Sequence, residues 1–72
     1  MVETRVLNAE HTIIGDFKDG KWLDVTKHYD IDFNGIEKSF WRVDTGSETI
    51  STLNRTKKEA MEDARKYLKK WL

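Results

Sequence analysis

The sequence contains no cysteine and no proline. Without cysteine the chain has neither disulfides nor thiolate metal ligands, so the fold depends on packing alone, as is usual in a reducing compartment. Without proline there is no cis-proline turn and no proline kink to place. The sequence also shows no basic segment followed by a long apolar run, and no stretch of roughly 20 apolar residues that would cross a bilayer. These absences predict a cytoplasmic protein with no membrane contact.

A length of 72 residues leaves room for one small core, and we treat residues 1–72 as a single domain. A core of this size rarely contributes more than about 3–5 kcal/mol of stability, so an enzyme cleft is hard to shape from it. Hydrophobic residues make up 38% of the chain and aromatic residues 11%. This supply of apolar side chains argues against disorder and predicts a folded domain.

Glycine is scarce, and its four positions, 15, 20, 35 and 46, divide the first two thirds of the chain into short segments. Asp19-Gly20 and Asn34-Gly35 favour two-residue hairpin turns, and Thr45-Gly46-Ser47 favours a slightly longer loop. The segments between them are rich in β-branched and aromatic residues, which favour strands. The predicted strands span residues 11–17, 22–33, 36–44 and 48–53, with Val2–Leu7 as a candidate edge segment.

The last third of the chain predicts one amphipathic helix. Thr56 and Glu59 form a capping box, in which Thr56 accepts from the amide of Glu59 and the Glu59 side chain reaches back. Apolar residues follow at helical spacing and predict one stripe that packs on the sheet. The stripe contains Ala60, Met61, Ala64, Tyr67, Leu68, Trp71 and Leu72. The predicted fold class is therefore α+β, a small antiparallel meander of about four strands packed on one face by a single C-terminal α-helix.

The turn at Asn34-Gly35 predicts the register of the central hairpin and places Phe33 opposite Ile36. Side chains alternate between faces along each strand, so this register sorts the sheet into two faces, although a single bulge would exchange them. The face predicted to receive the helix carries Leu23, Val25, Tyr29, Ile31, Phe33, Ile36 and Phe40. The open face carries Asp24, Thr26, His28, Asp30, Asp32, Glu37, Ser39, Trp41 and Val43, and the turn at Asp19-Gly20 adds Ile13, Phe17 and Trp22.

One helix covers only one face, so the open face exposes apolar side chains among acidic ones. Contiguous exposed apolar patches usually bind something, and tryptophan is enriched at binding hot spots. We therefore expect a non-catalytic binding module, whose partner is another protein or a second copy of the chain. The residues expected to bind are Phe17, Trp22, His28 and Trp41. The alternative for either tryptophan is an ordinary place in the core or under the N-terminal segment.

Charge is unevenly distributed along the neutral chain. Residues 1–54 hold ten acidic and six basic residues, whereas residues 55–72 hold three acidic and seven basic residues. A basic helix face would neutralise phosphates, so the alternative function is a nucleic-acid-binding module. Its candidate residues are Lys58, Arg65, Lys66, Lys69 and Lys70. Interrupting acidic residues and an acidic sheet argue against it.

His28, Asp30 and Asp32 are the only cluster of side chains with metal-binding or acid–base character, with His11 or Glu37 as a further ligand. Alternating polar residues are also what any solvated strand face shows. No serine has a nucleophile-elbow context and no glycine-rich phosphate loop is present. We therefore expect no metal site, no cofactor, no small-molecule substrate and no catalysis.

Overall fold

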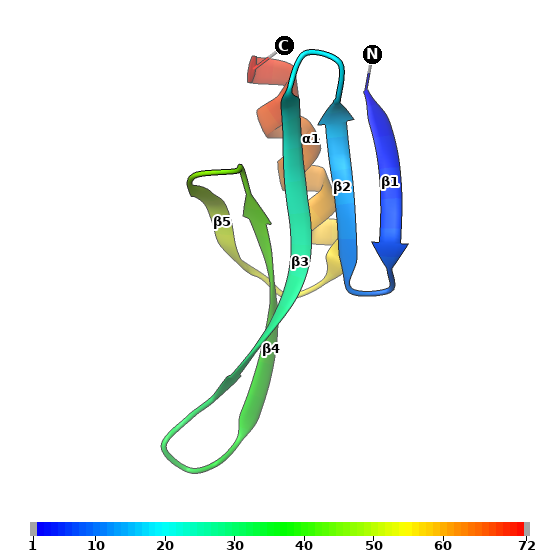
Figure 1. Ribbon diagram of the computed structural model, residues 1–72. Coiled ribbons are helices and arrows are strands. Elements are labelled where there is room, and N and C mark those ends of the chain that lie inside the picture. Colours follow the sequence, from blue (N-terminus) through cyan, green and yellow to red (C-terminus); the bar gives the residue numbers. More distant parts are fainter. Residues whose placement is uncertain (1, 72) are drawn as a thin grey trace.

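Over residues 2–71, five antiparallel strands form one open sheet in the order β1-β2-β3-β4-β5, and a single helix follows them (Figure 1). The computed structural model describes residues 2–71, apart from the side chains of residues 51–53. The strands are β1 (Glu3–Asn8), β2 (His11–Asp16), β3 (Lys21–Ile31), β4 (Glu37–Asp44) and β5 (Thr49–Asn54), and the helix is α1 (Lys57–Trp71). The predicted α+β class is confirmed, and the candidate edge segment forms β1.

Helix α1 begins at the predicted cap. The amide of Glu59 donates to Thr56 Oγ1 at 3.2 Å. The Glu59 carboxylate accepts from the amide of Arg55 at 3.0 Å, one residue before the amide that a capping box engages. The Thr56 side chain therefore satisfies one of the amides that the first helical turn leaves without a partner.

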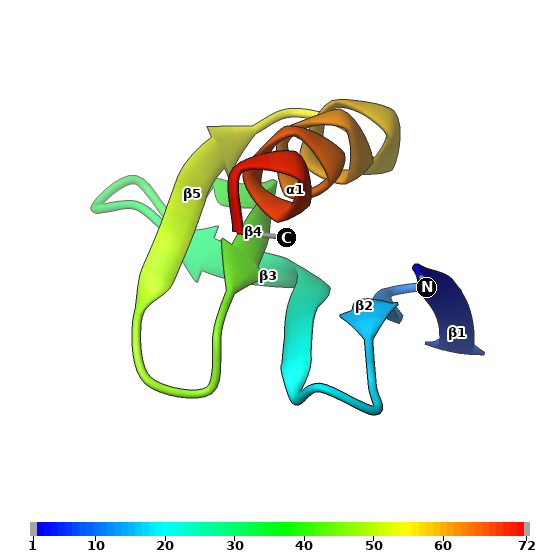
Figure 2. The same ribbon diagram turned by 90° about the horizontal axis from the view of Figure 1, so that it is seen from above.

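The core lies between α1 and one face of the sheet. The helix packs mainly on β3, β4 and β5, and Figure 2 shows β1 lying to one side of it. The sheet contributes Ile14, Leu23, Val25, Trp41 and Val43 to the core. From the predicted stripe, Ala60, Met61, Ala64 and Leu68 are buried, Tyr67 and Trp71 pack at the margin, and Leu72 lies outside the described residues.

The turn between β3 and β4 is not the predicted two-residue turn. The Asp32 amide donates to the Ile36 carbonyl at 3.1 Å, and Phe33, Asn34 and Gly35 form a three-residue loop between them. The Asp32 carboxylate accepts the amides of Asn34 and Ile36, each at 2.9 Å. Gly35 has a φ of +77°, the left-handed conformation that closes such a loop. The register of β4 is therefore one residue away from the prediction.

A one-residue change of register moves every side chain of β4 to the opposite face. Trp41 and Val43, predicted for the open face, point into the core, where Trp41 is 8% exposed. Phe40, predicted for the core, lies on the open face and stacks on His28. The prediction that Trp41 belongs to an exposed binding patch is wrong, because the hairpin loop contains three residues and not two.

The connection between β2 and β3 is also longer than predicted. Residues 17–20, and not Asp19-Gly20 alone, join the two strands. The pairing shifts by two residues, which leaves every side chain on its predicted face. Ile13 and Trp22 therefore remain on the open face, whereas Phe17 lies in the turn.

Gly15 allows β2 to pass closely beside Trp22. Its φ is +153°, and a Cβ there would lie 2.2 Å from the Lys21 carbonyl oxygen and 2.5 Å from Trp22 Cα. We predict that Gly15→Ala lowers the free energy of unfolding by about 1–3 kcal/mol, measured by urea denaturation. Gly46→Ala is the matched control, because a Cβ at Gly46 meets nothing within 4 Å. Equal losses of unfolding free energy in the two variants would contradict the close approach of β2 to Trp22.

The register predicts unequal effects for two neighbouring aromatic residues. Trp41→Ala should cost about 3–5 kcal/mol, which is comparable with the whole stability of so small a core. Phe40→Ala, on the opposite face, should cost only about 1 kcal/mol through the loss of its ring stack. Urea denaturation followed by circular dichroism measures both losses. A larger loss for Phe40→Ala than for Trp41→Ala would refute the observed register.

Candidate functional site

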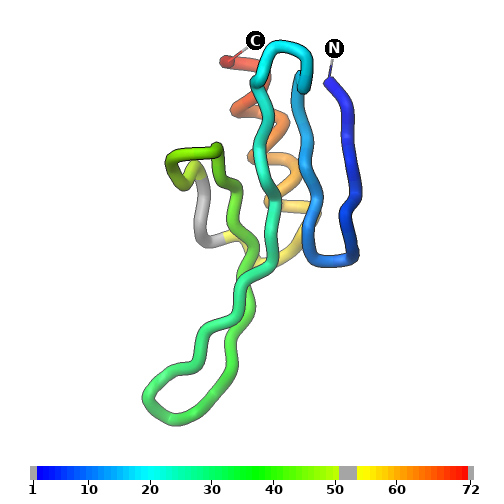
Figure 3. Tube along the Cα trace, viewed as in Figure 1, coloured from blue at the N-terminus to red at the C-terminus, as the bar shows by residue number. Residues whose placement is uncertain are grey.

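The far ends of β3 and β4 form a two-stranded arm, residues 28–40, that projects beyond the rest of the molecule (Figures 1 and 3). Strand length explains the projection. The 11 residues of β3 span about 36 Å, whereas the 15 residues of α1 span about 22 Å, so the helix cannot cover the whole strand. The neighbouring strands stop early as well, since β2 begins opposite Thr26 and β5 ends opposite Trp41.

The arm carries large apolar side chains that α1 does not reach. Ile31 is 68% exposed, and Phe33 at the tip is fully exposed. The exposed apolar residues of the arm are Tyr29, Ile31, Phe33 and Ile36. Their predicted place in the core is wrong, because α1 begins at Lys57 near the root of the arm and runs away from the tip (Figure 1). Three acidic residues and one lysine lie among them, Asp30, Asp32, Glu37 and Lys38, so the arm is both apolar and acidic.

The turn between β1 and β2 supports the root of the arm. The Lys27 amide donates to the Glu10 carbonyl at 2.9 Å. The Tyr29 hydroxyl donates to the Glu10 carboxylate. Across the two strands, the rings of His28 and Phe40 stack with their centroids 5.6 Å apart. The root is therefore held by side chains as well as by backbone pairing.

The structure does not bring the four predicted partner-binding residues into one patch. Trp41 is in the core. Trp22 is half-buried on the open face, and Phe17 lies in the β2–β3 turn beneath the Arg5 guanidinium, whose carbon is 4.2 Å from the ring centroid. His28 belongs to the root of the arm. Sequence reasoning therefore identified parts of the open face but missed the tip of the arm.

A cavity lies beside β4 at the root of the arm. Lys38, Phe40 and Arg42 from β4 meet Asn54 and Arg55, at the end of β5, around a volume of about 520 Å³. Strand alternation in the sequence already places the three β4 residues on one face. The contribution of Asn54 and Arg55 depends on the path of β5, which no local signal indicates.

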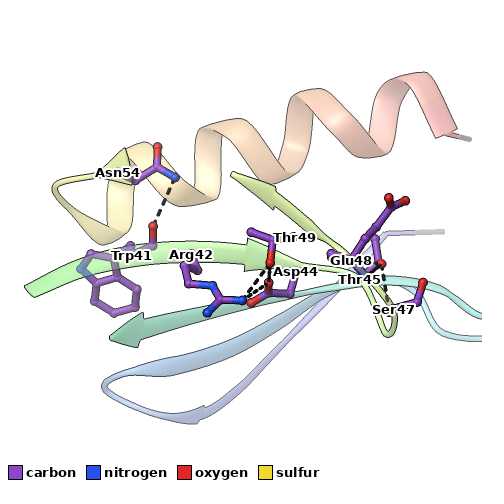
Figure 4. Close-up of polar contacts among 8 residues, drawn as sticks. All are labelled: Trp41, Arg42, Asp44, Thr45, Ser47, Glu48, Thr49 and Asn54. Carbon is purple, nitrogen blue, oxygen red and sulfur yellow. Dashed lines mark hydrogen bonds and ion pairs between the residues drawn. The ribbon is translucent and has the colours of Figure 1, made fainter. Parts of the chain in front are cut away.

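Polar contacts hold Arg42 and the end of β5 in place (Figure 4). Arg42 Nη2 donates to Asp44 Oδ1 at 3.0 Å and to Thr49 Oγ1 at 2.8 Å. The Thr49 hydroxyl donates to the same Asp44 oxygen at 2.7 Å. Asn54 Nδ2 donates to the Trp41 carbonyl at 3.5 Å. Arg42 is therefore held by side chains of both strands that border the cavity, β4 and β5.

The remaining candidate clusters lie elsewhere. Within residues 2–71, no three histidine, aspartate or glutamate side chains converge as metal ligands. His28 stacks on Phe40, and His11 pairs with Asp24 at 3.1 Å. The five basic residues of the nucleic-acid alternative, Lys58, Arg65, Lys66, Lys69 and Lys70, are all exposed on α1.

Comparison of the chain with protein-family models, with curated proteins and with solved structures found no match. In the part of the chain that the structure describes, no helix is long and apolar enough to cross a membrane. The arm and the cavity beside β4 are the two candidate sites that the described residues form.

The contact between Tyr29 and Glu10 predicts a measurable titration. Hydrogen bonding to the Glu10 carboxylate, with desolvation and the charges of Glu10 and Glu37, raises the pKa of the Tyr29 phenol above its ordinary value. Because the folded pKa exceeds the unfolded one, this contact stabilises the fold fully below about pH 10. Its contribution is lost as the pH rises through the raised pKa.

We predict that Glu10→Gln lowers the pKa of Tyr29, because a neutral amide does not repel the phenolate. Ultraviolet absorbance of the phenolate in a Tyr67→Phe background measures it. Glu3→Gln, at an exposed position on β1, is the matched control and should leave the titration unchanged. An unchanged titration in Glu10→Gln would show that the contact does not form.

Proposed function

We propose that this chain is a non-catalytic protein-binding module and that the arm is the element that binds. The observation that carries the proposal is the exposure of Tyr29, Ile31, Phe33 and Ile36 on one projecting pair of strands. Monomeric proteins seldom expose contiguous apolar surface without using it. Aromatic and large apolar side chains also supply most of the binding energy at protein interfaces.

The turn at the tip supports this proposal, because it pre-organises the apolar side chains. Asp32 accepts two amides and Gly35 closes the loop, so Phe33 is presented from a defined backbone. A binding element that is already ordered loses less conformational entropy on association.

The charge of the arm favours a protein partner over a nucleic acid. At the tip of the arm, Asp32 and Glu37 would repel a phosphate backbone, whereas they suit the polar rim of a protein interface. The partner is another protein or a second copy of the chain, with no cofactor. The absence of cysteine makes the reducing cytoplasm the compartment that we propose. The nucleic-acid alternative uses the exposed helix face and stays a separate prediction.

Photo-crosslinking in the cells that make the protein tests the arm directly. Phe33→p-benzoylphenylalanine keeps an aromatic ring at the tip, and we expect it to give adducts of discrete mass. The mass shows whether the partner is a second copy or another protein. The same substitution at Leu7, an exposed residue of β1, is the matched control and should give no such adduct.

Ile31→Ser with Ile36→Ser should remove the adducts, because a partner loses two apolar contacts. Both side chains are exposed, so the unfolding midpoint should change by no more than about 0.5 kcal/mol in free energy. Identical adducts from positions 33 and 7, or adducts that survive the double substitution, would rule out the arm as the binding element.

A further inference from the structure

One edge of β4 has no neighbouring strand within the arm. Strand β5 pairs with β4 only as far as Asn54 opposite Trp41, and the chain then leaves toward α1 at Lys57. None of the described strands lies beside Glu37–Ser39 on this side of β4. Figure 1 shows β5 ending above the arm, where the two strands of the arm cross.

The backbone of Ser39 faces this open edge. The Asp32 amide donates to the Ile36 carbonyl, and hydrogen-bonded pairs alternate along an antiparallel ladder. The pair Tyr29–Ser39 is therefore a non-hydrogen-bonded pair, and the N–H and C=O of Ser39 point away from β3. The Trp41 carbonyl, two residues farther on, points the same way and accepts from Asn54. A strand beside β4 would thus find backbone donors and acceptors ready to pair.

The cavity described above opens at this edge, and its charge is unbalanced. Lys38, Arg42 and Arg55 contribute three positive charges and Asp30 one negative charge, and Asp44 pairs with Arg42, so the cationic excess comes from Lys38 and Arg55. The ring of Phe40 supplies an apolar surface among them. Such a combination suits a carboxylate carried on an extended chain, because cations bind the acid while the neighbouring backbone pairs.

We infer that the arm binds an extended acidic peptide segment of another protein, which adds to β4 as a sixth strand. One Asp or Glu side chain of that segment enters the cavity, and its backbone pairs with Ser39. This inference rests on the proposed function and names the chemistry of the partner. The apolar tip then contacts the body of the protein that carries the segment.

Selection from a library of random octapeptides, displayed as internal segments, tests the inference with a defined probe. We expect the enriched peptides to carry at least one Asp or Glu among β-branched residues, which favour extended strands. The dissociation constant of the most enriched peptide, labelled with a fluorophore, is then measured by fluorescence anisotropy. A consensus without acidic residues, or no enrichment, would overturn the inference.

Three variants separate the backbone contribution from the charge contribution. Ser39→Pro removes one outward amide at an edge position, where proline is tolerated. Arg55→Gln removes one exposed cation from the cavity wall. Each should weaken peptide binding by about tenfold, whereas Arg65→Gln on the exposed face of α1 should change it by less than about twofold. Binding within twofold of the parent in both Ser39→Pro and Arg55→Gln would overturn the inference.

Circular dichroism and urea denaturation establish that each variant is folded. If Ser39→Pro does not fold, Lys38→Gln replaces it as the second variant of the test. Failure of the strand-addition inference is distinguishable from failure of the proposed function. Adducts at position 33 without any acidic peptide selection would leave the arm as a binding element and reject only strand addition at β4.

Discussion

The carboxylate of Asp32 and the left-handed conformation of Gly35 set the register on which the rest of the structure depends. Asp32 accepts the amides of Asn34 and Ile36, so the central hairpin closes with three residues and not two. That one residue decides which face of β4 meets α1, because alternate side chains point to opposite faces. The burial of Trp41 in the core thus depends on a turn at the tip of an exposed arm.

The second constraint on the structure is the length of the helix relative to that of β3. The helix has 15 residues and rises about 1.5 Å per residue, which is less than half the rise per residue of a strand. It therefore covers only part of the 11-residue strand β3. The portion left outside ends at Ile31, and the loop that follows carries Phe33. Burying one such side chain contributes about 1.5–3 kcal/mol, which the isolated chain leaves unused and a partner can recover.

The arm presents different chemistry at its tip and at its root. The tip combines apolar side chains with Asp32 and Glu37, whereas Lys38, Arg42 and Arg55 gather at the root. A partner that presents an apolar patch and an acidic extended segment would complement both.

What the sequence by itself determined is the set of elements. The five strands and the helix lie close to their predicted bounds, because turn residues, β-branched segments and the cap at Thr56 act over a few neighbouring residues. The face of Trp22 was also predictable, since a turn longer by two residues preserves the alternation.

Only the tertiary structure decided the face of Trp41 and the place of the candidate site. Asn34-Gly35 suits a two-residue turn and a three-residue loop alike, and the difference came from the Asp32 carboxylate and from packing against α1. The exposed tip followed from the relative lengths of two elements distant in sequence. The cavity followed from the path of β5, which brings Arg55 beside β4. Local propensities contain none of these relations, because each is a distance between segments that meet only when the chain is folded.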